Sequence, residues 1–400
     1  MKKFLILLLL LAGCGHITTE PSIPETSENF RIGARVTHDL SEPQIEFLNA
    51  CFYYVMTPLL EEDMRDAIRG PQLILYRSIQ GTWEGFDQFD WEHIDSHENM
   101  FLHHEGARIQ TVWGSWLMNP GDFVDESAPD AMDHWINYYA VTAAEQVYAY
   151  GYDGLFVDSA SHWLNPSAVD GVMPDDYDLD NWYQDRVDGL AYVKSKLPDR
   201  FVVFNGLHNR HGAEDSLANT DGGMWETFAF EPGIGKYRGE EEWSEVLELV
   251  MRHPDRFIVL VVKEQPGLTD DVRKRLFSVG SYLLVSGEKV VFSMSDEEHT
   301  RTNSLLYYPE YTLDLGAPLG NYTRSENGLY LRSFEKGLVI VNPSETKTLS
   351  MMLSSSFMRV VPAGGGEVDE VGGWDGSLSY EPVSGEVSLP PVSALLLVVP

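Results

Sequence analysis

The chain has 400 residues, a formal net charge of −34 and only two cysteines. So acidic a surface repels phosphate backbones and anionic lipids, which argues against a nucleic-acid partner and for neutral or cationic ligands. The length exceeds that of an ordinary domain but suits a single α/β barrel. The other cysteine, Cys14, lies in the N-terminal segment, so Cys51 has no partner for an internal disulfide. We expect Cys51 to pack as a small core residue.

The first 29 residues indicate export and anchoring. Lys2 and Lys3 precede an apolar run over residues 4–11, too short to cross a bilayer, and Leu-Ala-Gly precedes Cys14. The arrangement resembles a bacterial lipoprotein signal (residues 1–14), which implies a lipid on Cys14. Residues 15–29 are expected to form a flexible tether. We therefore expect a protein of the bacterial cell envelope, anchored by its lipid. Gly15 favours the outer membrane.

Strand-like and helix-like stretches alternate over residues 30–322. A helix is predicted over residues 127–150, with Ser127 as its N-cap. Alternating helices and buried strands predict a parallel sheet, and about eight repeats predict a (β/α)8 TIM barrel. One apolar run is in excess, and we expect it to be either 32–36 or 290–292. The runs lie at residues 32–36, 51–56, 73–76, 109–113, 155–157, 201–204, 223–225, 257–262 and 290–292.

The pattern changes near residue 323. Helical periodicity ends, and short apolar runs are separated by Lys-Gly, Asn-Pro and Gly-Gly-Gly. This pattern predicts a C-terminal antiparallel β-sandwich over residues 323–400. The expected fold class is therefore α/β, a barrel followed by a sandwich.

Two carboxylates stand where barrel strands are expected to end. Asp158 follows the run 155–157 and Glu226 follows the run 223–225, and the carboxyl ends of barrel strands carry the chemistry. A carboxylate pair in an aromatic-lined mouth suits cleavage of a glycosidic bond in a carbohydrate substrate. Taken singly, each acid could be a strand-end cap and each tryptophan a packing residue. The expected substrate-binding residues are Tyr76, Arg77, Trp113, Trp116, Trp163, Asn205, Trp225 and Glu264.

The two acids are expected to differ in role. Glu226 lies beside Trp225 and Met224, and apolar surroundings favour the protonated acid that donates to the leaving oxygen. Asp158 is expected to stay ionised, helped by donors such as Asn205 or Arg77. A separation of about 5 to 5.5 Å between the carboxyls would indicate a retaining enzyme, and about 6.5 to 9.5 Å an inverting one.

Residues 151–159, Gly-Tyr-Asp-Gly-Leu-Phe-Val-Asp-Ser, resemble the nucleophile strand of many barrel glycoside hydrolases. Further stretches resemble the hypothetical glycosyl hydrolase family 15 group, barrel proteins presumed to act on glycans, over roughly residues 31–400. This resemblance implies a barrel glycosidase that includes the C-terminal sandwich. These stretches are residues 75–78, 100–106, 118–120, 197–207 and 225–226.

About 80 residues are also similar to dextranase-type enzymes of glycoside hydrolase family 66. The Gly-aromatic-Asp-Gly strand, the Leu-Pro to Val-Phe-Asn stretch and the Glu beside Trp carry this likeness. It implies that Asp158 is the nucleophile and Glu226 the acid/base of a retaining mechanism. Ser159 and Ala160 depart from that family's Thr-Ile, so its substrate is not implied.

Two other functions remain open. A barrel that has lost activity would be a glycan-binding surface lipoprotein, and a barrel could also hydrolyse an ester or amide. No nucleophile–His pair or metal triad supports the latter. No cofactor and no metal are expected. Asn181 and Val187 break the calcium-loop pattern that begins at Asp176, and the pairs His103–His104 and His208–His211 lack a third ligand.

Overall fold

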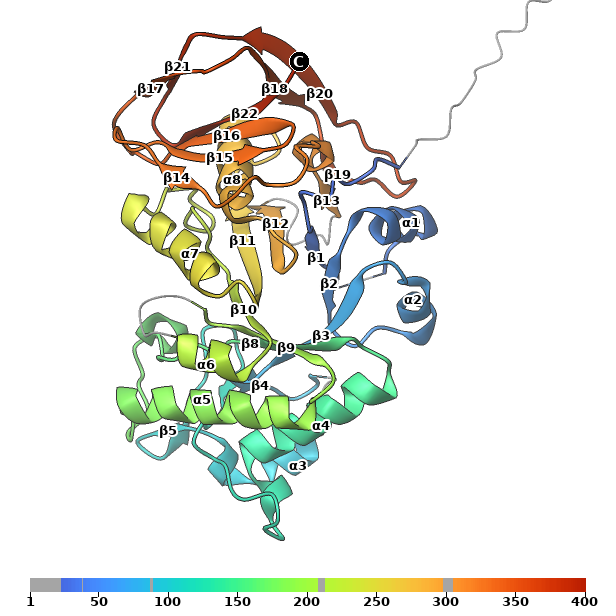
Figure 1. Ribbon diagram of the computed structural model, residues 1–400. Coiled ribbons are helices and arrows are strands. Elements are labelled where there is room, and N and C mark those ends of the chain that lie inside the picture. The colour runs from blue at the N-terminus through green and yellow to red at the C-terminus, as the bar shows by residue number, and fades with distance from the viewer. Residues whose placement is uncertain (1–22, 38, 87–88, 208–212, 298–304) are drawn as a thin grey trace, which may run out of the picture.

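The computed structural model describes residues 23–37, 39–86, 89–207, 213–297 and 305–400 (Figure 1). The predicted signal, Cys14 and the first part of the tether lie outside the described residues, as do His208 and His211. Over the described ranges, no helix combines the length and the apolar character needed to cross a bilayer.

Eight parallel strands form the barrel at the centre of the molecule. Each strand pairs with the next along the chain. The ring closes where Ile32 bridges Phe292, whose amide donates to the carbonyl of Arg31 at 2.8 Å. The predicted barrel is thus confirmed. Its strands are β1 (Gly33–Arg35), β2 (Tyr54–Thr57), β3 (Gln72–Ser78), β8 (Gly154–Asp158), β9 (Phe201–Asn205), β10 (Gly222–Trp225), β11 (Phe257–Gln265) and β12 (Val290–Asp296).

Helices surround the barrel, and local sequence fixes their ends. Ser41 caps the first one by accepting from the Gln44 amide, while the Gln44 side chain accepts from the Ser41 amide. Asp178 caps α5 by accepting from the Asn181 amide. The helices after the first seven strands are α1 (Glu42–Cys51), α2 (Glu62–Ala67), α4 (Trp135–Ala149), α5 (Leu179–Lys196), α6 (Glu214–Asn219), α7 (Glu240–Arg252) and α8 (Val272–Val285).

The strand prediction at residues 109–113 was wrong, and both 32–36 and 290–292 contribute to the barrel. The apolar run belongs instead to an insertion, residues 79–134, between β3 and α4. There Gln110 bridges Trp116, so the run pairs locally and not with the barrel. The insertion contains β4 (Gly81–Thr82), α3 (Trp91–Asp95), η1 (Glu98–Met100), β5 (His103–His104), β6 (Ala107–Arg108), β7 (Trp116–Leu117) and η2 (Ala131–Asp133).

The predicted start of the long helix was also wrong. The Ser127 hydroxyl donates to Asp125 Oδ1 at 2.6 Å, and the same oxygen accepts from the Ser127 amide. Ser127 therefore belongs to a turn, and α4 begins only at Trp135, after η2.

Side chains alternate between the barrel interior and the layer beneath the helices. One face of each strand fills the barrel centre, where Ile74, Phe156 and Met224 pack together. The opposite face carries residues such as Leu155 and Leu260 into the larger core under the helices. This period of two decides which strand-end residues face the mouth. Cys51 is a buried free thiol in the larger core, as predicted.

The C-terminal region consists of antiparallel sheets, which confirms the predicted sandwich. A six-stranded sheet packs on a two-stranded one through an apolar layer that includes Ile340, Leu353 and Leu389. The larger sheet has the order β14 (Thr323–Arg324), β15 (Tyr330–Phe334), β16 (Gly337–Asn342), β22 (Ser393–Val398), β18 (Phe357–Ala363) and β20 (Ser377–Val383), and the smaller one pairs β17 (Leu349–Met352) with β21 (Glu386–Leu389).

The contact between α8 and the larger sheet joins this region to the barrel. Helix α8 lies beneath the larger sheet (Figure 1), and its Gly280 meets Ala394 so closely that a Cβ would come within 2.6 Å of the Ala394 methyl. Arg275 of α8 also pairs at 3.0 Å with Glu310 of η5 (Pro309–Thr312), and both side chains are fully buried. β13 (Leu306–Tyr307) pairs with β19 (Gly366–Glu367).

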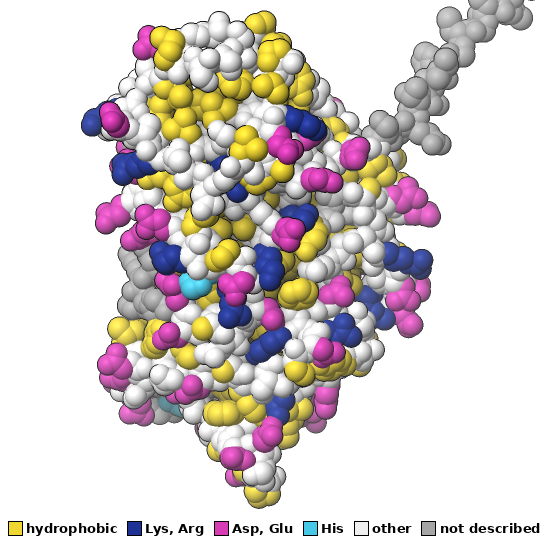
Figure 2. All heavy atoms as spheres, viewed as in Figure 1, with side chains coloured by type: hydrophobic (Ala, Val, Ile, Leu, Met, Phe, Trp, Pro, Cys, Tyr) yellow, Lys and Arg dark blue, Asp and Glu magenta, His cyan; other side chains and the backbone are white. Residues whose placement is uncertain are grey.

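Figure 2 shows acidic and basic side chains interspersed over one face, with hydrophobic side chains gathered over the C-terminal strands. The excess of acids is thus not segregated into one patch of this face. The charge at the mouth of the barrel therefore depends on the residues that line it.

Candidate active site

One asparagine joins the two predicted catalytic carboxylates. Asp158 is the last residue of β8, Asn205 the last of β9, and Glu226 follows β10. The Asn205 amide nitrogen donates to Asp158 Oδ1 at 2.8 Å and to Glu226 Oε2 at 3.1 Å. Two oxygens within hydrogen-bond reach of one nitrogen lie less than about 6 Å from each other. Three adjacent strands thus bring the acids to one point.

Tyr76 holds the other side of Asp158. Its hydroxyl donates a hydrogen bond to Asp158 Oδ2, and the Ser159 hydroxyl lies 3.4 Å from the same oxygen. Burial raises the pKa of Tyr76, and the negative charge of Asp158 raises it further. The phenol therefore stays protonated as a donor. The Arg35 guanidinium lies over the Tyr76 ring, 5.1 Å from its centroid.

Lys263 pairs with Glu226, a contact to which the sequence reasoning gave no role. Its ammonium lies 2.6 Å from Glu226 Oε1. Burial alone would lower the pKa of Lys263, but the Glu226 charge and hydrogen bond outweigh burial and raise it. The sequence could have indicated that Lys263 points inward, because the inward-facing Val259 and Val261 precede it at a period of two.

Asp158 and Glu226 line a cavity of 730 Å³. Tyr76, Asn205 and Trp163 line it, as does Trp113, which is 72% exposed and belongs to the insertion and not to a strand end. Trp83 and Phe86 of the same insertion also line it, with their rings stacked at 4.1 Å, and sequence reasoning did not identify either. The size is that of a small-ligand site.

Arg77 does not face this mouth, contrary to our expectation, whereas Trp225 is among the residues that line the cavity. Tyr76 points inward, so its neighbour on the strand points outward. Arg77 is 0% exposed, bonds Gln146 Oε1 of α4 at 2.8 Å and lies over Phe89. It therefore supplies no donor to Asp158. Trp225 is 2% exposed, and its side chain belongs to the core beneath the helices, so it offers no free ring face.

The remaining two predicted residues lie at the margins. Trp116 is half-buried in β7, packs on the core and does not line the cavity. Glu264 lines a smaller cavity of 230 Å³, which shares Arg35, Glu226 and Lys263 with the larger one. A register shift in β11 and a left-handed φ of 47° let Glu264 turn inward directly after Lys263.

Comparisons with solved structures support the fold. The chain is 12% identical to Amy13B of Eubacterium rectale (TM-score 0.53), covering 94% of this chain and 97% of that one. It is 12% identical to AmyB, a noncanonic maltogenic alpha-amylase of Thermotoga neapolitana (TM-score 0.50), covering 92% and 98%. The glycoside hydrolase domain of PelA from Pseudomonas aeruginosa is 16% identical, with a TM-score of 0.45 over 66% of this chain and 95% of that one. The likeness to Amy13B and AmyB, at identities this low, indicates a shared architecture only.

No curated protein matches the sequence significantly. A sequence profile of the hypothetical glycosyl hydrolase family 15 matches residues 78–338, more than half of the chain and the part that carries both acids. The predicted resemblance is thereby confirmed, and the chain belongs to the hypothetical glycosyl hydrolase family 15.

Proposed function

We propose that this protein hydrolyses glycosidic bonds of a poly- or oligosaccharide with retention of configuration. Asp158 is the nucleophile and Glu226 the acid/base. The observation that carries the proposal is the shared donor Asn205, whose amide nitrogen lies 2.8 Å from Asp158 Oδ1 and 3.1 Å from Glu226 Oε2 at the cavity mouth. These two distances keep the oxygens less than about 6 Å apart, below the separation of about 6.5 to 9.5 Å that an inverting enzyme needs for its water.

In the first step, Asp158 Oδ attacks the anomeric carbon, the glycosidic C–O bond breaks, and protonated Glu226 gives its proton to the leaving oxygen. In the second, Glu226 takes a proton from water, the water oxygen bonds to the anomeric carbon, and the Asp158 ester bond breaks. Tyr76 and Asn205 stabilise the departing Asp158 carboxylate as it regains its charge.

The aromatic rim supports a carbohydrate substrate. Trp113, Trp83 and Trp163 border the same cavity as the acids, and flat rings pack against the C–H faces of sugars. Among the described residues of the mouth, the cations Arg35 and Lys263 balance two of its acids, so these residues do not oppose a neutral sugar. We infer that the substrate is a neutral glycan.

A second candidate function is glycan capture without cleavage, and the contacts of Glu226 favour it. Both Glu226 oxygens already accept hydrogen bonds, Oε1 from Lys263 and Oε2 from Asn205, so neither is free to present a proton to the leaving oxygen in the first step. Catalysis therefore requires that a bound sugar displace Lys263 or supply compensating contacts. If it does not, the site binds glycans only.

The deciding experiment measures reducing-sugar release from a panel of neutral, amino and acidic polysaccharides. Asp158→Ala and Glu226→Gln should each abolish release. Azide should restore activity to Asp158→Ala and yield a glycosyl azide, because the small anion replaces the missing carboxylate. Release that survives either substitution would refute the assignment. Binding of one glycan by the wild type without any cleavage would establish the capture function.

We also propose that Cys14 is lipidated and tethers the protein to the bacterial envelope, in the outer membrane. The proposal rests on the residues before Cys14. In a bacterial host, labelled palmitate should enter the wild type but not Cys14→Ser, which should appear in the soluble fraction. Equal labelling of both would contradict it.

A further inference from the structure

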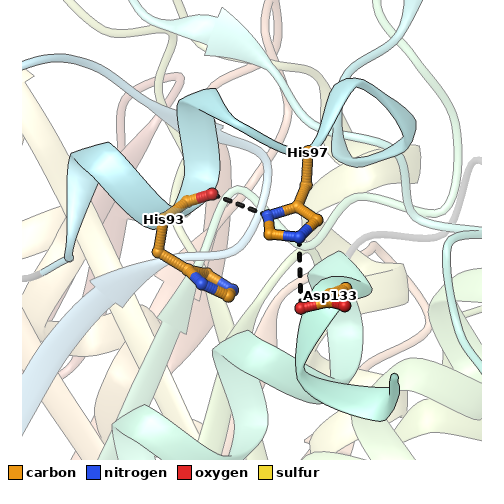
Figure 3. A group of neighbouring side chains, drawn as sticks. All are labelled: His93, His97 and Asp133. Carbon is orange, nitrogen blue, oxygen red and sulfur yellow. Dashed lines mark hydrogen bonds and ion pairs between the residues drawn. The ribbon is translucent and has the colours of Figure 1, made fainter. Parts of the chain in front are cut away.

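Three side chains of types that can bind metal ions lie close together in the insertion, away from the cavity mouth. His93 comes from α3, His97 from the turn before η1, and Asp133 from the end of η2 (Figure 3). One ligand atom from each lies within 4.8 Å of the others. None of the three lines the catalytic cavity.

The hydrogen bonds of His97 prepare its ring for a cation. Its Nδ1 lies 2.8 Å from the carbonyl oxygen of His93, which can only accept, so Nδ1 carries the proton. The other nitrogen, Nε2, then faces Asp133 Oδ1 at 3.1 Å. A metal ion bound here would take His97 Nε2 and Asp133 Oδ1 as two of its ligands.

Neighbouring groups hold both imidazoles in fixed orientations. Histidine ligands of metals commonly donate their other N–H to a backbone carbonyl, which fixes tautomer and ring orientation. The His93 ring stacks on Tyr138 at 4.9 Å and lies 4.6 Å from the His97 ring, so both imidazoles are oriented. The 3.1 Å between His97 and Asp133 is close to the spacing of two ligands on one tetrahedral ion whose bonds are about 2.0 to 2.2 Å long.

We propose that His93, His97 and Asp133 bind one Zn²⁺ ion, with water completing a tetrahedral site. Two imidazoles and one carboxylate suit zinc, whereas Mg²⁺ and Ca²⁺ prefer oxygen ligands only. The site joins the α3 end of the insertion to the segment before α4, and Trp113 lies between these ends in sequence. Zinc thus braces the part of the chain that supplies Trp113. The site does not depend on the proposed catalysis.

Calorimetry tests the site on the exported chain carrying Cys14→Ser. Zinc chloride should bind in a one-to-one ratio, and Mg²⁺ should give no heat of binding. His97→Ala and Asp133→Asn should each weaken zinc affinity at least tenfold, and zinc should raise the wild-type Tm but not theirs. Asp133→Asn preserves shape, so it tests the ligand even if His97→Ala folds poorly.

The matched control is His253→Ala. His253 also pairs with an acid, Glu214, at 2.6 Å, but lies outside the cluster. It should leave zinc affinity unchanged. No zinc binding by the wild type would overturn the proposal and leave the cluster as a hydrogen-bonded His–Asp pair. Equal affinity in the wild type, His97→Ala and Asp133→Asn, or an equal loss in His253→Ala, would also overturn it.

Discussion

Removing one oxygen from Tyr76 tests the proposed mechanism. In Tyr76→Phe the hydrogen bond to Asp158 is lost, while the ring, which packs on Phe156 at 6.0 Å, remains. In the glycosyl-enzyme Asp158 is a neutral ester, and it regains its charge as water displaces it. The hydroxyl therefore stabilises the transition state of the second step more than the intermediate before it.

The structure also sets the size of the effect. One hydrogen bond to a charged group contributes about 1.5 to 3 kcal/mol. Each 1.36 kcal/mol is a tenfold change in rate, so kcat should fall about 10- to 150-fold. Because only the second step slows, the glycosyl-enzyme should accumulate, and KM should fall together with kcat.

Stopped-flow kinetics and intact-protein mass spectrometry on the responding glycan measure this effect. A burst of first product and a mass increase of one glycosyl unit should appear in Tyr76→Phe. The matched control is Tyr148→Phe, which also removes a hydroxyl that donates to a carboxylate, Asp199, far from the mouth. A kcat within twofold of wild type, an equal loss in Tyr148→Phe, or a fall in kcat/KM as large as that in kcat would refute the reasoning.

Three further results are expected. Glu310→Ala leaves buried Arg275 without its carboxylate and should cost about 3 to 5 kcal/mol in urea unfolding; a loss below 1 kcal/mol would contradict this. Burial raises the pKa of Cys51 from 9.0 to about 12, so at pH 8 the native thiol should react with a disulfide reagent about a thousandfold more slowly than the unfolded one; equal rates would show that the thiol is accessible. Trp113→Ala should raise KM about tenfold with little change in Tm, since its ring is exposed, whereas Trp225→Ala should lose about 3 to 5 kcal/mol of stability; the reverse pattern would show that Trp113 is the core ring.

The strand ends that carry the proposed catalytic residues could be predicted from the sequence, because a strand end is indicated by a few neighbouring residues. An apolar run that stops at an acid identifies a strand end, and parallel strands bring their carboxyl ends to one edge. Asp158, Asn205 and Glu226 end neighbouring strands, so their convergence follows from the barrel itself.

The errors have two physical origins. Arg77 was predicted without regard to alternation along the strand, although its neighbour Tyr76 points inward. The run at residues 109–113 has the composition of a barrel strand, but its partner is Trp116, six residues after Gln110. The composition of an apolar run does not show which segment it pairs with. The inward orientation of Lys263 could be predicted from the alternation of side chains along its strand. Glu264 reaches the mouth only through a backbone irregularity that no sequence pattern indicates.

The contact between α8 and the C-terminal sheet has a consequence for how the protein denatures. Gly280 meets Ala394 without space for a methyl group. Without the sheet, the outer face of α8 would be bare apolar surface. The two regions should therefore melt in one cooperative transition, and a chain cut near residue 322 should aggregate when expressed alone.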